Sequence, residues 1–235
     1  MERLDKILVS QGIGSRKEVQ KLIRSKSVTV NSELVTKPET KLDPDEAEIC
    51  VKGRRLSFKK HIYLMLHKPS GYVSATEDNL SATVMELVPK EFMRKGLAPA
   101  GRLDKDTEGL LILTDDGDFA HRLISPKSKV YKRYYAELDF GITEDDVRKF
   151  REGIELDNGE KCLSARLEKA GETSAFAEIC EGKFHQIKKM FAACSKKVLY
   201  LKRVSIGGLK LDGNLPKGEC RELTKTEKDA LFIGI

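Results

Sequence analysis

Residues 101–117 of this 235-residue chain read GRLDKDTEGLLILTDDG. The apolar run Leu110 to Leu113 stands between Gly109 and the turn-forming Asp115-Asp116-Gly117, which predicts a short buried strand. The charged residues that precede the run therefore lie in a loop at the start of this strand. Charge clusters are usually solvated surface, so composition alone favours an ordinary loop, and only the order of the residues points further.

Other strand-like runs surround this segment and indicate the class of the fold. Short runs of β-forming residues recur at 62–66, 134–138, 163–167, 175–179 and 198–201. Helical patterns occur near Met85 and at 119–124, 144–152 and 185–194. Strands outnumber helices, and the turn Asp157-Asn158-Gly159 favours a hairpin. We therefore expect an α+β domain over residues 62–235, with a mixed, mainly antiparallel sheet.

A separate small domain is expected over residues 1–58, followed by a basic linker at 59–61. Gly12 ends a first helix, and Ser15 with Glu18 forms a capping box for a second one. The second helix carries three basic residues at positions i, i+4 and i+7, which place them on one face: Lys17, Lys21 and Arg24.

Short strands complete this small domain. Val28-Thr29-Val30 is strand-like, and the turn-like pair Asn31-Ser32 follows it. A second strand is expected from Ala47 to Val51, beyond the turn at Pro44-Asp45. Two helices and a few short strands are enough for a small independent module.

Positive charge is concentrated in the first quarter of the chain. Residues 1–60 hold 14 lysines and arginines against 9 aspartates and glutamates, a net charge of +5. The whole chain carries +6, which leaves +1 for residues 61–235. A local basic excess is expected of a module that binds a phosphate backbone, and a solvated basic face is the plain alternative.

Several classes of protein are disfavoured by what the sequence lacks. The first residues carry charges of both signs, and no apolar run approaches the length of a membrane span, so we expect a cytoplasmic protein. The five cysteines form no CxxC pair and the four histidines no HxxxH pair, so neither a metal site nor a disulfide framework is expected. No phosphate-binding or dinucleotide-binding glycine motif occurs.

The first domain resembles the S4 RNA-binding module. The matching residues are Arg3-Leu4-Asp5-Lys6, Leu8, Gly12, Ser15-Arg16 and Val28-Thr29-Val30-Asn31. Ser27 and Ser32 stand where that family usually has glycine. The resemblance implies RNA binding, which we assign to four basic residues of the second helix: Arg16, Lys17, Lys21 and Arg24. A small helical cap that only packs on the next domain is the alternative.

The order of residues in 101–117 resembles the catalytic motif of RNA pseudouridine synthases, Gly-Arg-Leu-Asp followed by Thr-x-Gly-Leu-Leu. The resemblance implies that Asp104 is the essential catalytic residue. Arg3-Leu4-Asp5-Lys6 repeats the central tetrapeptide without the flanking glycine and threonine. We therefore expect Asp5 to be non-catalytic.

Three other stretches resemble the same family. Residues 66–72 read LHKPSGY and resemble its first motif, with an ordinary turn as the alternative. Lys132-Arg133-Tyr134 resembles the segment whose tyrosine stacks on the target base, with a core aromatic as the alternative. Residues 181–190 read EGKFHQIKKM and resemble a motif whose basic residue pairs with the catalytic aspartate. That position falls on Lys188, and the adjacent Lys189 stays a rival.

Further RNA contacts are expected around the catalytic motif. Arg102 is expected to bind a phosphate or to fill the space that an extruded base leaves. Lys68 and Lys189 are assigned to RNA binding. Isomerisation of uridine involves no redox change, so the resemblance implies no cofactor.

The C-terminal half resembles the subgroup that modifies small-subunit ribosomal RNA, on the residues DDG at 115–117, RVSIGGL at 203–209 and PKGE at 216–219. We expect a monomer that isomerises one uridine of 16S (small-subunit) ribosomal RNA, free or in a ribonucleoprotein particle. The alternatives are a synthase for 23S (large-subunit) ribosomal RNA, an RNA glycosidase that uses the same carboxylate, and a non-catalytic S4-type assembly factor.

Overall fold

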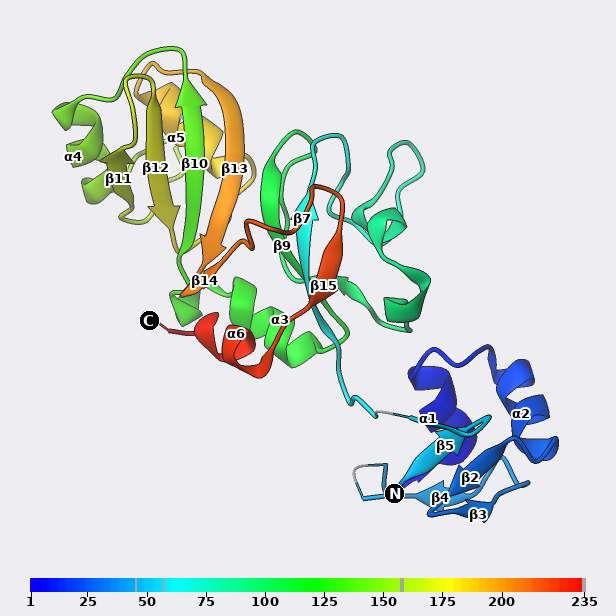
Figure 1. Cartoon of the computed structure of the whole chain (residues 1–235). Helices are drawn as coiled ribbons and strands as arrows, with labels where there is room; N and C mark the ends of the chain where they lie inside the picture. Colours follow the sequence, from blue (N-terminus) through cyan, green and yellow to red (C-terminus); the bar gives the residue numbers. More distant parts are fainter. Residues whose placement is uncertain (45, 57, 157–158, 234–235) are drawn as a thin grey trace. The chain divides into compact units, whose positions relative to one another are not determined.

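The computed structural model describes residues 1–44, 46–56, 58–156 and 159–233. The chain divides into two compact units, which Figure 1 shows in colours that follow the sequence. The first unit comprises Met1–Ile62 and Pro89–Leu97, and the second begins at Tyr63 and takes the remainder. The segment Pro89–Leu97 is held in the first unit in part by Arg94, whose guanidinium donates to the carbonyl of Lys59 at 3.2 Å.

The first unit contains two helices and short strands around one apolar core. Helices α1 (Leu4–Ser10) and α2 (Arg16–Arg24) precede a sheet of order β3-β2-β5-β6, formed by Glu33–Leu34, Val28–Val30, Ile49–Val51 and Arg54–Arg55. Strand β1 (Glu2–Arg3) pairs with β4 (Lys41–Leu42). The core of this unit consists of Leu4, Ile7, Leu8, Val19, Ile23, Val28, Leu42 and Ile49.

The predicted start of α2 is confirmed. The backbone N–H of Ser15 donates to Glu18 Oε2 at 2.7 Å, and the N–H of Glu18 donates to Ser15 Oγ at 3.4 Å. Both bonds satisfy backbone donors that the first turn of a helix leaves free. Val19 and Ile23 are buried, while the predicted basic residues of the helix are exposed: Arg16, Lys17, Lys21 and Arg24.

The predicted turn at Asn31-Ser32 is also confirmed, as a two-residue connection between β2 and β3. Asn31 and Ser32 have φ values of 50° and 70°, the left-handed geometry that matches the twist of a tight hairpin. Asn31 tolerates this geometry better than most residues, and its Oδ1 accepts from the N–H of Glu48 at 2.9 Å. Asp45, in the second predicted turn, lies outside the described residues.

The second unit is built on a sheet of order β11-β12-β10-β13-β9-β7-β15, with β8 beside β9 and β14 beside β13. The strands are β7 (Tyr63–Lys68), β8 (Ala98–Pro99), β9 (Glu108–Thr114), β10 (Lys132–Leu138), β11 (Arg166–Lys169), β12 (Ser174–Ile179), β13 (Val198–Ile206), β14 (Leu209–Lys210) and β15 (Cys220–Glu222). The pairing of β13 with β9 is parallel, and the neighbouring pairings in the sheet are antiparallel. The predicted mixed, mainly antiparallel sheet is confirmed.

Helices and short turns cover this sheet (Figure 1). They are α3 (Gly117–Ile124), α4 (Glu144–Glu152), α5 (Gln186–Ala193) and α6 (Lys225–Ala230), with 3-10 turns at Val84–Leu87 and Pro126–Ser128; a further 3-10 turn lies at Lys90–Phe92. Apolar residues from the strands, from α3 and from the connection before β10 form a core on β7 and β9: Met65, Leu110, Ile112, Leu123, Val130 and Ile206. The turn at Lys90–Phe92 belongs to the first unit.

One predicted strand is displaced, and several short elements were not predicted, among them β15 and α6. The apolar pattern at 163–167 predicted a strand, but β11 begins only at Arg166. Leu163 is half exposed, and its N–H donates to Glu181 Oε1 instead of to a neighbouring strand. Strand β15 and helix α6 are short, and their sequences carry no clear periodicity. The predicted hairpin turn includes Asp157-Asn158, outside the described residues.

Gly109 explains how the loop before β9 is brought beside β13. Gly109 pairs with Arg203 in the parallel ladder and has a φ of 108°. A Cβ atom at this position would lie 2.2 Å from the carbonyl oxygen of Arg203. Only glycine accepts both the backbone angle and the close approach. The strand therefore begins at a fixed place, and residues 101–107 lead into it as a constrained loop.

Candidate active site

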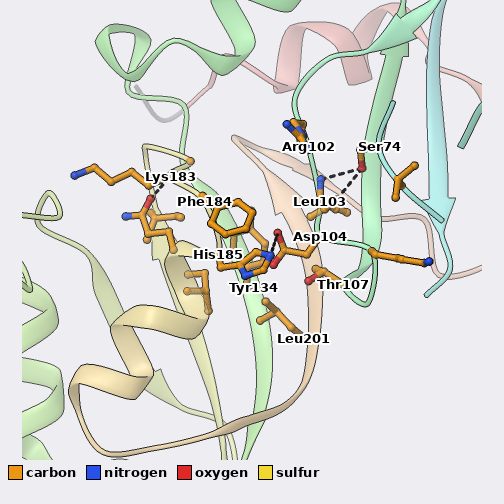
Figure 2. Close-up of a pocket in the computed structure, with 16 residues that line it drawn as sticks. Ser74, Arg102, Leu103, Asp104, Thr107, Tyr134, Lys183, Phe184, His185 and Leu201 are labelled. Carbon is orange, nitrogen blue, oxygen red and sulfur yellow. Dashed lines mark hydrogen bonds and ion pairs between the residues drawn. The ribbon is translucent and has the colours of Figure 1, made fainter. Parts of the chain in front are cut away.

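Asp104 lies on a cavity of about 380 Å³ in the second unit, a volume in the range of small-ligand sites. Figure 2 shows the side chains that line it. They come from the segment after β7, from the loop before β9, from β10, β12 and β13, and from the start of α5 with the segment that precedes it. They include Arg102, Asp104, Tyr134, Lys183, Phe184 and His185.

The Asp104 carboxylate faces two basic side chains from α5 and its N-terminal flank. Its Oδ2 atom lies 3.3 Å from Lys188 Nζ, and its Oδ1 atom lies 3.6 Å from His185 Nε2. The side chains of Asp104 and Lys188 are each about a quarter exposed. The carboxylate is thus partly shielded, paired with a cation and open to the cavity.

Lys188 also contacts a second carboxylate. Its Nζ donates to Asp106 Oδ1 at 2.5 Å. Burial tends to raise the pKa of Asp106, but the hydrogen bond and charge of Lys188 outweigh it and hold that pKa below its ordinary value. Two carboxylates therefore share one ammonium group.

Tyr134 forms a buried wall of the cavity. The residue is 8% exposed, and its hydroxyl accepts a hydrogen bond from Arg203 Nη1 at 3.3 Å. Arg203 is itself 4% exposed, and its Nε donates to the carbonyl of Leu110 at 2.7 Å. A buried arginine thus fixes the phenol ring against the first residues of β9.

Comparisons with known proteins agree with this geometry. The family model described as RNA pseudouridylate synthase matches residues 62–193, and the S4 domain model matches residues 2–47. The chain belongs to the RNA pseudouridine synthase family. It is therefore an isomerase that converts uridine to pseudouridine in RNA, and it carries an S4 domain.

Similar proteins align over nearly the whole chain. The chain is 43% identical to an uncharacterised RNA pseudouridine synthase of Bacillus subtilis, over 96% of each chain. It is 40% identical to the ribosomal small subunit pseudouridine synthase A of Escherichia coli, over 96% of this chain and 97% of that one. A crystal structure of a pseudouridylate synthase, 35% identical, covers 98% of this chain and all of that chain with a TM-score of 0.68.

In this synthase the structure shows which of the two adjacent lysines, Lys188 or Lys189, faces Asp104. Lys189 points to another partner, and its Nζ lies 5.2 Å from the centroid of the Phe184 ring. Adjacent residues of a helix point about 100° apart, so only one of the two lysines can face Asp104. Lys188 occupies that position, and Lys189 stays a proposed RNA contact.

The assignment of Lys68 to RNA binding is corrected by its burial. Lys68 is 0% exposed, so it cannot contact a phosphate in this conformation. Its ammonium group instead donates to backbone carbonyls of its own turn and of the catalytic loop, at 2.8 to 3.2 Å: Pro69, Asp104, Lys105 and Thr107. Burial lowers the pKa of Lys68 to about 8, opposed by the nearby carboxylates, so it is mainly charged at neutral pH. Lys68 holds the loop that carries Asp104 in place.

A second anchor acts on the same loop. Ser74 Oγ donates to the carbonyl of Leu103 at 2.9 Å and accepts from the N–H of Leu103 at 3.0 Å. The N–H of Gly71 donates to the carbonyl of Lys105 at 2.8 Å. The segment after β7, which the sequence marks by its Lys-Pro-Ser-Gly turn, therefore supports the loop that carries Asp104.

The other predicted RNA contacts lie on the surface. Arg102 is exposed and lines the cavity beside Asp104. Arg16, Lys17, Lys21 and Arg24 belong to α2 of the first unit, where Arg16 also lies 3.7 Å from the buried carboxylate of Asp5. Asp5 accepts two hydrogen bonds from Arg3 at 2.9 Å. Its role in the first unit is structural.

Several residues of the site were not assigned a function from the sequence, among them His185 beside Asp104 and Arg203 beside Tyr134. His185 lies within the motif at 181–190, but nothing in the sequence pattern indicates that its ring faces Asp104. Arg203 lies on β13 among alternately buried residues, and its partner Tyr134 is 69 positions away in the sequence.

Among the described residues, no group of three or more His, Cys, Asp or Glu is placed to hold a metal ion. In the described parts of the chain, no helix is long and apolar enough to cross a membrane.

Proposed function

We propose that this synthase isomerises one uridine of small-subunit (16S) ribosomal RNA, with Asp104 as its catalytic carboxylate. The observation that carries the catalytic part is the pairing of Asp104 with Lys188 on a cavity that Tyr134 also lines. The substrate assignment is supported by near-complete alignment with relatives named ribosomal small subunit pseudouridine synthase A. A large-subunit (23S) substrate is the alternative within the family.

The reaction leaves the atoms of the nucleotide unchanged in number. The N1–C1′ bond of uridine breaks, the base turns, and a C5–C1′ bond forms. The hydrogen on C5 leaves as a proton, and N1 takes up a proton. A carboxylate assists as nucleophile at C1′, as stabiliser of positive charge on the sugar, or as base at C2′. Each of these roles requires Asp104 to be ionised.

Lys188 supports that ionised state. When RNA covers the cavity, loss of water disfavours a carboxylate, and a cation within about 4 to 6 Å opposes this effect. Lys188 Nζ lies within that range of Asp104 and is held there by Asp106. We assign Asp104 and Lys188 to the chemical step, and Asp106 to the positioning of Lys188.

The remaining groups handle the base and the backbone. A stacked uridine is inaccessible, so it must be extruded, at a cost of a few kcal/mol. Stacking on Tyr134 offsets part of this cost, since one base–aromatic stack contributes about 1 to 3 kcal/mol. Arg102 binds a phosphate or fills the vacated space. The basic face of α2 binds phosphates farther along the RNA.

The assembly that we propose is a cytoplasmic monomer acting on ribosomal RNA or on its ribonucleoprotein particle. Pseudouridine mapping in both ribosomal RNAs, from cells with and without the gene, tests the substrate. Loss of one small-subunit site is expected. Loss of a large-subunit site instead would support the alternative substrate.

Tritium release tests the chemistry with the purified protein. RNA labelled with tritium at uridine C5 should lose the label while it keeps the base, because isomerisation replaces that hydrogen. Release of free uracil would indicate a glycosidase. An RNA-bound protein that releases neither tritium nor uracil would indicate a non-catalytic assembly factor.

A further inference from the structure

We propose that the ring of Phe184 is a second nucleobase subsite, which stacks a base adjacent to the extruded uridine. This inference rests on the proposed function and extends it from the reacting nucleotide to its neighbour. The ligand class is an unpaired nucleobase of the same RNA strand. No role in the proposed chemistry is assigned to the phenyl ring itself.

The exposure of Phe184 separates it from the other aromatic side chain of the cavity. Phe184 is 71% exposed and Tyr134 is 8% exposed, although both line the same cavity. Figure 2 shows the Phe184 ring beside His185, above the Asp104 carboxylate. Tyr134 therefore belongs to the buried wall and Phe184 to the open side. A base held on Tyr134 is enclosed, and the strand that continues from it passes the open side.

The neighbours of Phe184 suit a nucleotide. The rings of Phe184 and His185 are stacked, with centroids 3.8 Å apart and an angle of 19° between the planes. A base would therefore stack on the face that the imidazole does not cover, and the 71% exposure of Phe184 makes the ring accessible to it. The ammonium group of Lys189 lies 5.2 Å from the Phe184 centroid, within the range of a cation–π contact. An aromatic face with a nearby cation is the combination that binds single-stranded nucleic acid without regard to sequence.

Buried hydrogen bonds hold the segment that carries Phe184. The N–H of Lys183 donates to Gln186 Oε1 at 2.9 Å, and Gln186 Nε2 donates to Glu181 Oε1 at 2.6 Å. Gln186 and Glu181 are 3% and 7% exposed. His185 has a φ of 53°, which few residues other than glycine adopt. The platform is therefore ordered before RNA arrives, and stacking on it costs little conformational entropy.

The test compares Phe184→Leu with Phe140→Leu. Phe140 is 68% exposed and is not among the residues that line the cavity. Phe140→Leu is therefore a matched control, because it removes an equally exposed phenyl ring away from the cavity. The substrate is a synthetic RNA containing the uridine that the mapping identifies. Two further RNAs keep the backbone but lack the base on the 5′ or the 3′ side of that uridine. The measured quantity is Kd, with melting curves for each variant.

Phe184→Leu is expected to raise Kd for the complete RNA by about 5- to 150-fold, the range of one base stack. For one of the two abasic RNAs, wild type and Phe184→Leu should bind equally, because the stacked base is absent. Phe184→Tyr keeps an aromatic face and should restore most of the affinity. Phe140→Leu should bind every RNA as wild type does.

Two results would overturn the subsite while leaving the proposed function intact. One is a Phe184→Leu protein that binds the complete RNA as tightly as Phe140→Leu does. The other is a Phe184→Leu protein whose Kd exceeds that of wild type by the same factor on the complete RNA and on both abasic RNAs. A wild-type protein that isomerises no uridine would overturn the proposed function, and the subsite with it.

Discussion

The ammonium nitrogen of Lys188 lies 3.3 Å from Oδ2 of Asp104, although Lys188 belongs to the first turn of α5. A cation in the first turn of a helix opposes the helix dipole, so this position does not serve the stability of α5. It serves the pairing with Asp104.

Lys188→Met is expected to slow single-turnover isomerisation by about 100-fold or more, the effect of removing one preorganised charge contact from an active site. Lys189→Met, which removes the same charge one residue away, should weaken RNA binding and leave the saturating rate near that of wild type. Equal losses of rate in the two variants would contradict the assignment.

Asp104→Asn and Asp5→Asn should have opposite effects, although both change the aspartate of an Arg-Leu-Asp-Lys tetrapeptide. Asp104→Asn removes the charge that each proposed role needs, so isomerisation should be undetectable while the thermal midpoint is kept. Asp5→Asn loses charge-assisted bonds to Arg3 and should cost about 1 to 3 kcal/mol of stability, with turnover retained by the folded protein. Single-turnover assays measure the isomerisation rate of both variants, and melting curves measure their stability. A folded Asp104→Asn protein that still isomerises uridine would defeat the mechanism.

The order of neighbouring residues was enough to predict the loop that carries Asp104, the strand after it and the capped helix α2. It was not enough for relationships that depend on distant segments. Lys188 and Lys189 differ only in the direction in which the helix orients their side chains. The carboxylates that they could face lie far away in the sequence, and Asp106 is separated from Lys188 by 82 positions. The burial of Lys68 depends on carbonyls 36 to 39 residues away. The tie between Arg203 and Tyr134 depends on the register of two paired strands.

Lys68→Met should impair the enzyme through its loop. The substitution leaves carbonyls of the catalytic loop without their donor, so we expect a loss of about 3 kcal/mol of stability and a fall in the single-turnover rate. Lys105→Met is the control, because Lys105 is an exposed lysine of the same loop and should keep the thermal midpoint. If Lys68→Met only weakens RNA binding and flattens its salt dependence, Lys68 is a phosphate contact after all.

Asp146 should make stability depend on acid pH. Its Oδ2 lies 2.7 Å from Lys196 Nζ, both side chains are more than 90% buried, and it also accepts from the N–H of Thr143. Burial tends to raise the pKa of Asp146, but these contacts outweigh it and hold the pKa below the ordinary 3.8. Since the folded-state pKa is depressed, the stabilisation is present above about pH 3.8 and is lost as pH falls through the folded-state value.

Asp146→Asn should therefore lower the free energy of unfolding by about 3 to 5 kcal/mol at pH 7, because it leaves Lys196 buried without its partner. The difference from wild type should shrink as pH falls below 3.8. Urea unfolding of both proteins across this range measures it. Asp145→Asn, at an exposed neighbouring position, should lose much less. A difference that is constant with pH would show that the charge of Asp146 is not the cause.

The basic face of α2 should contribute to the salt dependence of RNA binding. Lys17, Lys21 and Arg24 are exposed, and on single-stranded RNA each phosphate contact contributes about 0.7 to the slope of log K against log salt concentration. Changing all three to glutamine should reduce the slope by about 2 and weaken binding, while the rate on saturating RNA persists. A triple change of Lys169, Lys210 and Lys225, exposed in the second unit, removes the same charge and should leave the slope nearly unchanged. If the two triple variants lower the slope equally, the effect is one of net charge and α2 is not the phosphate-binding surface.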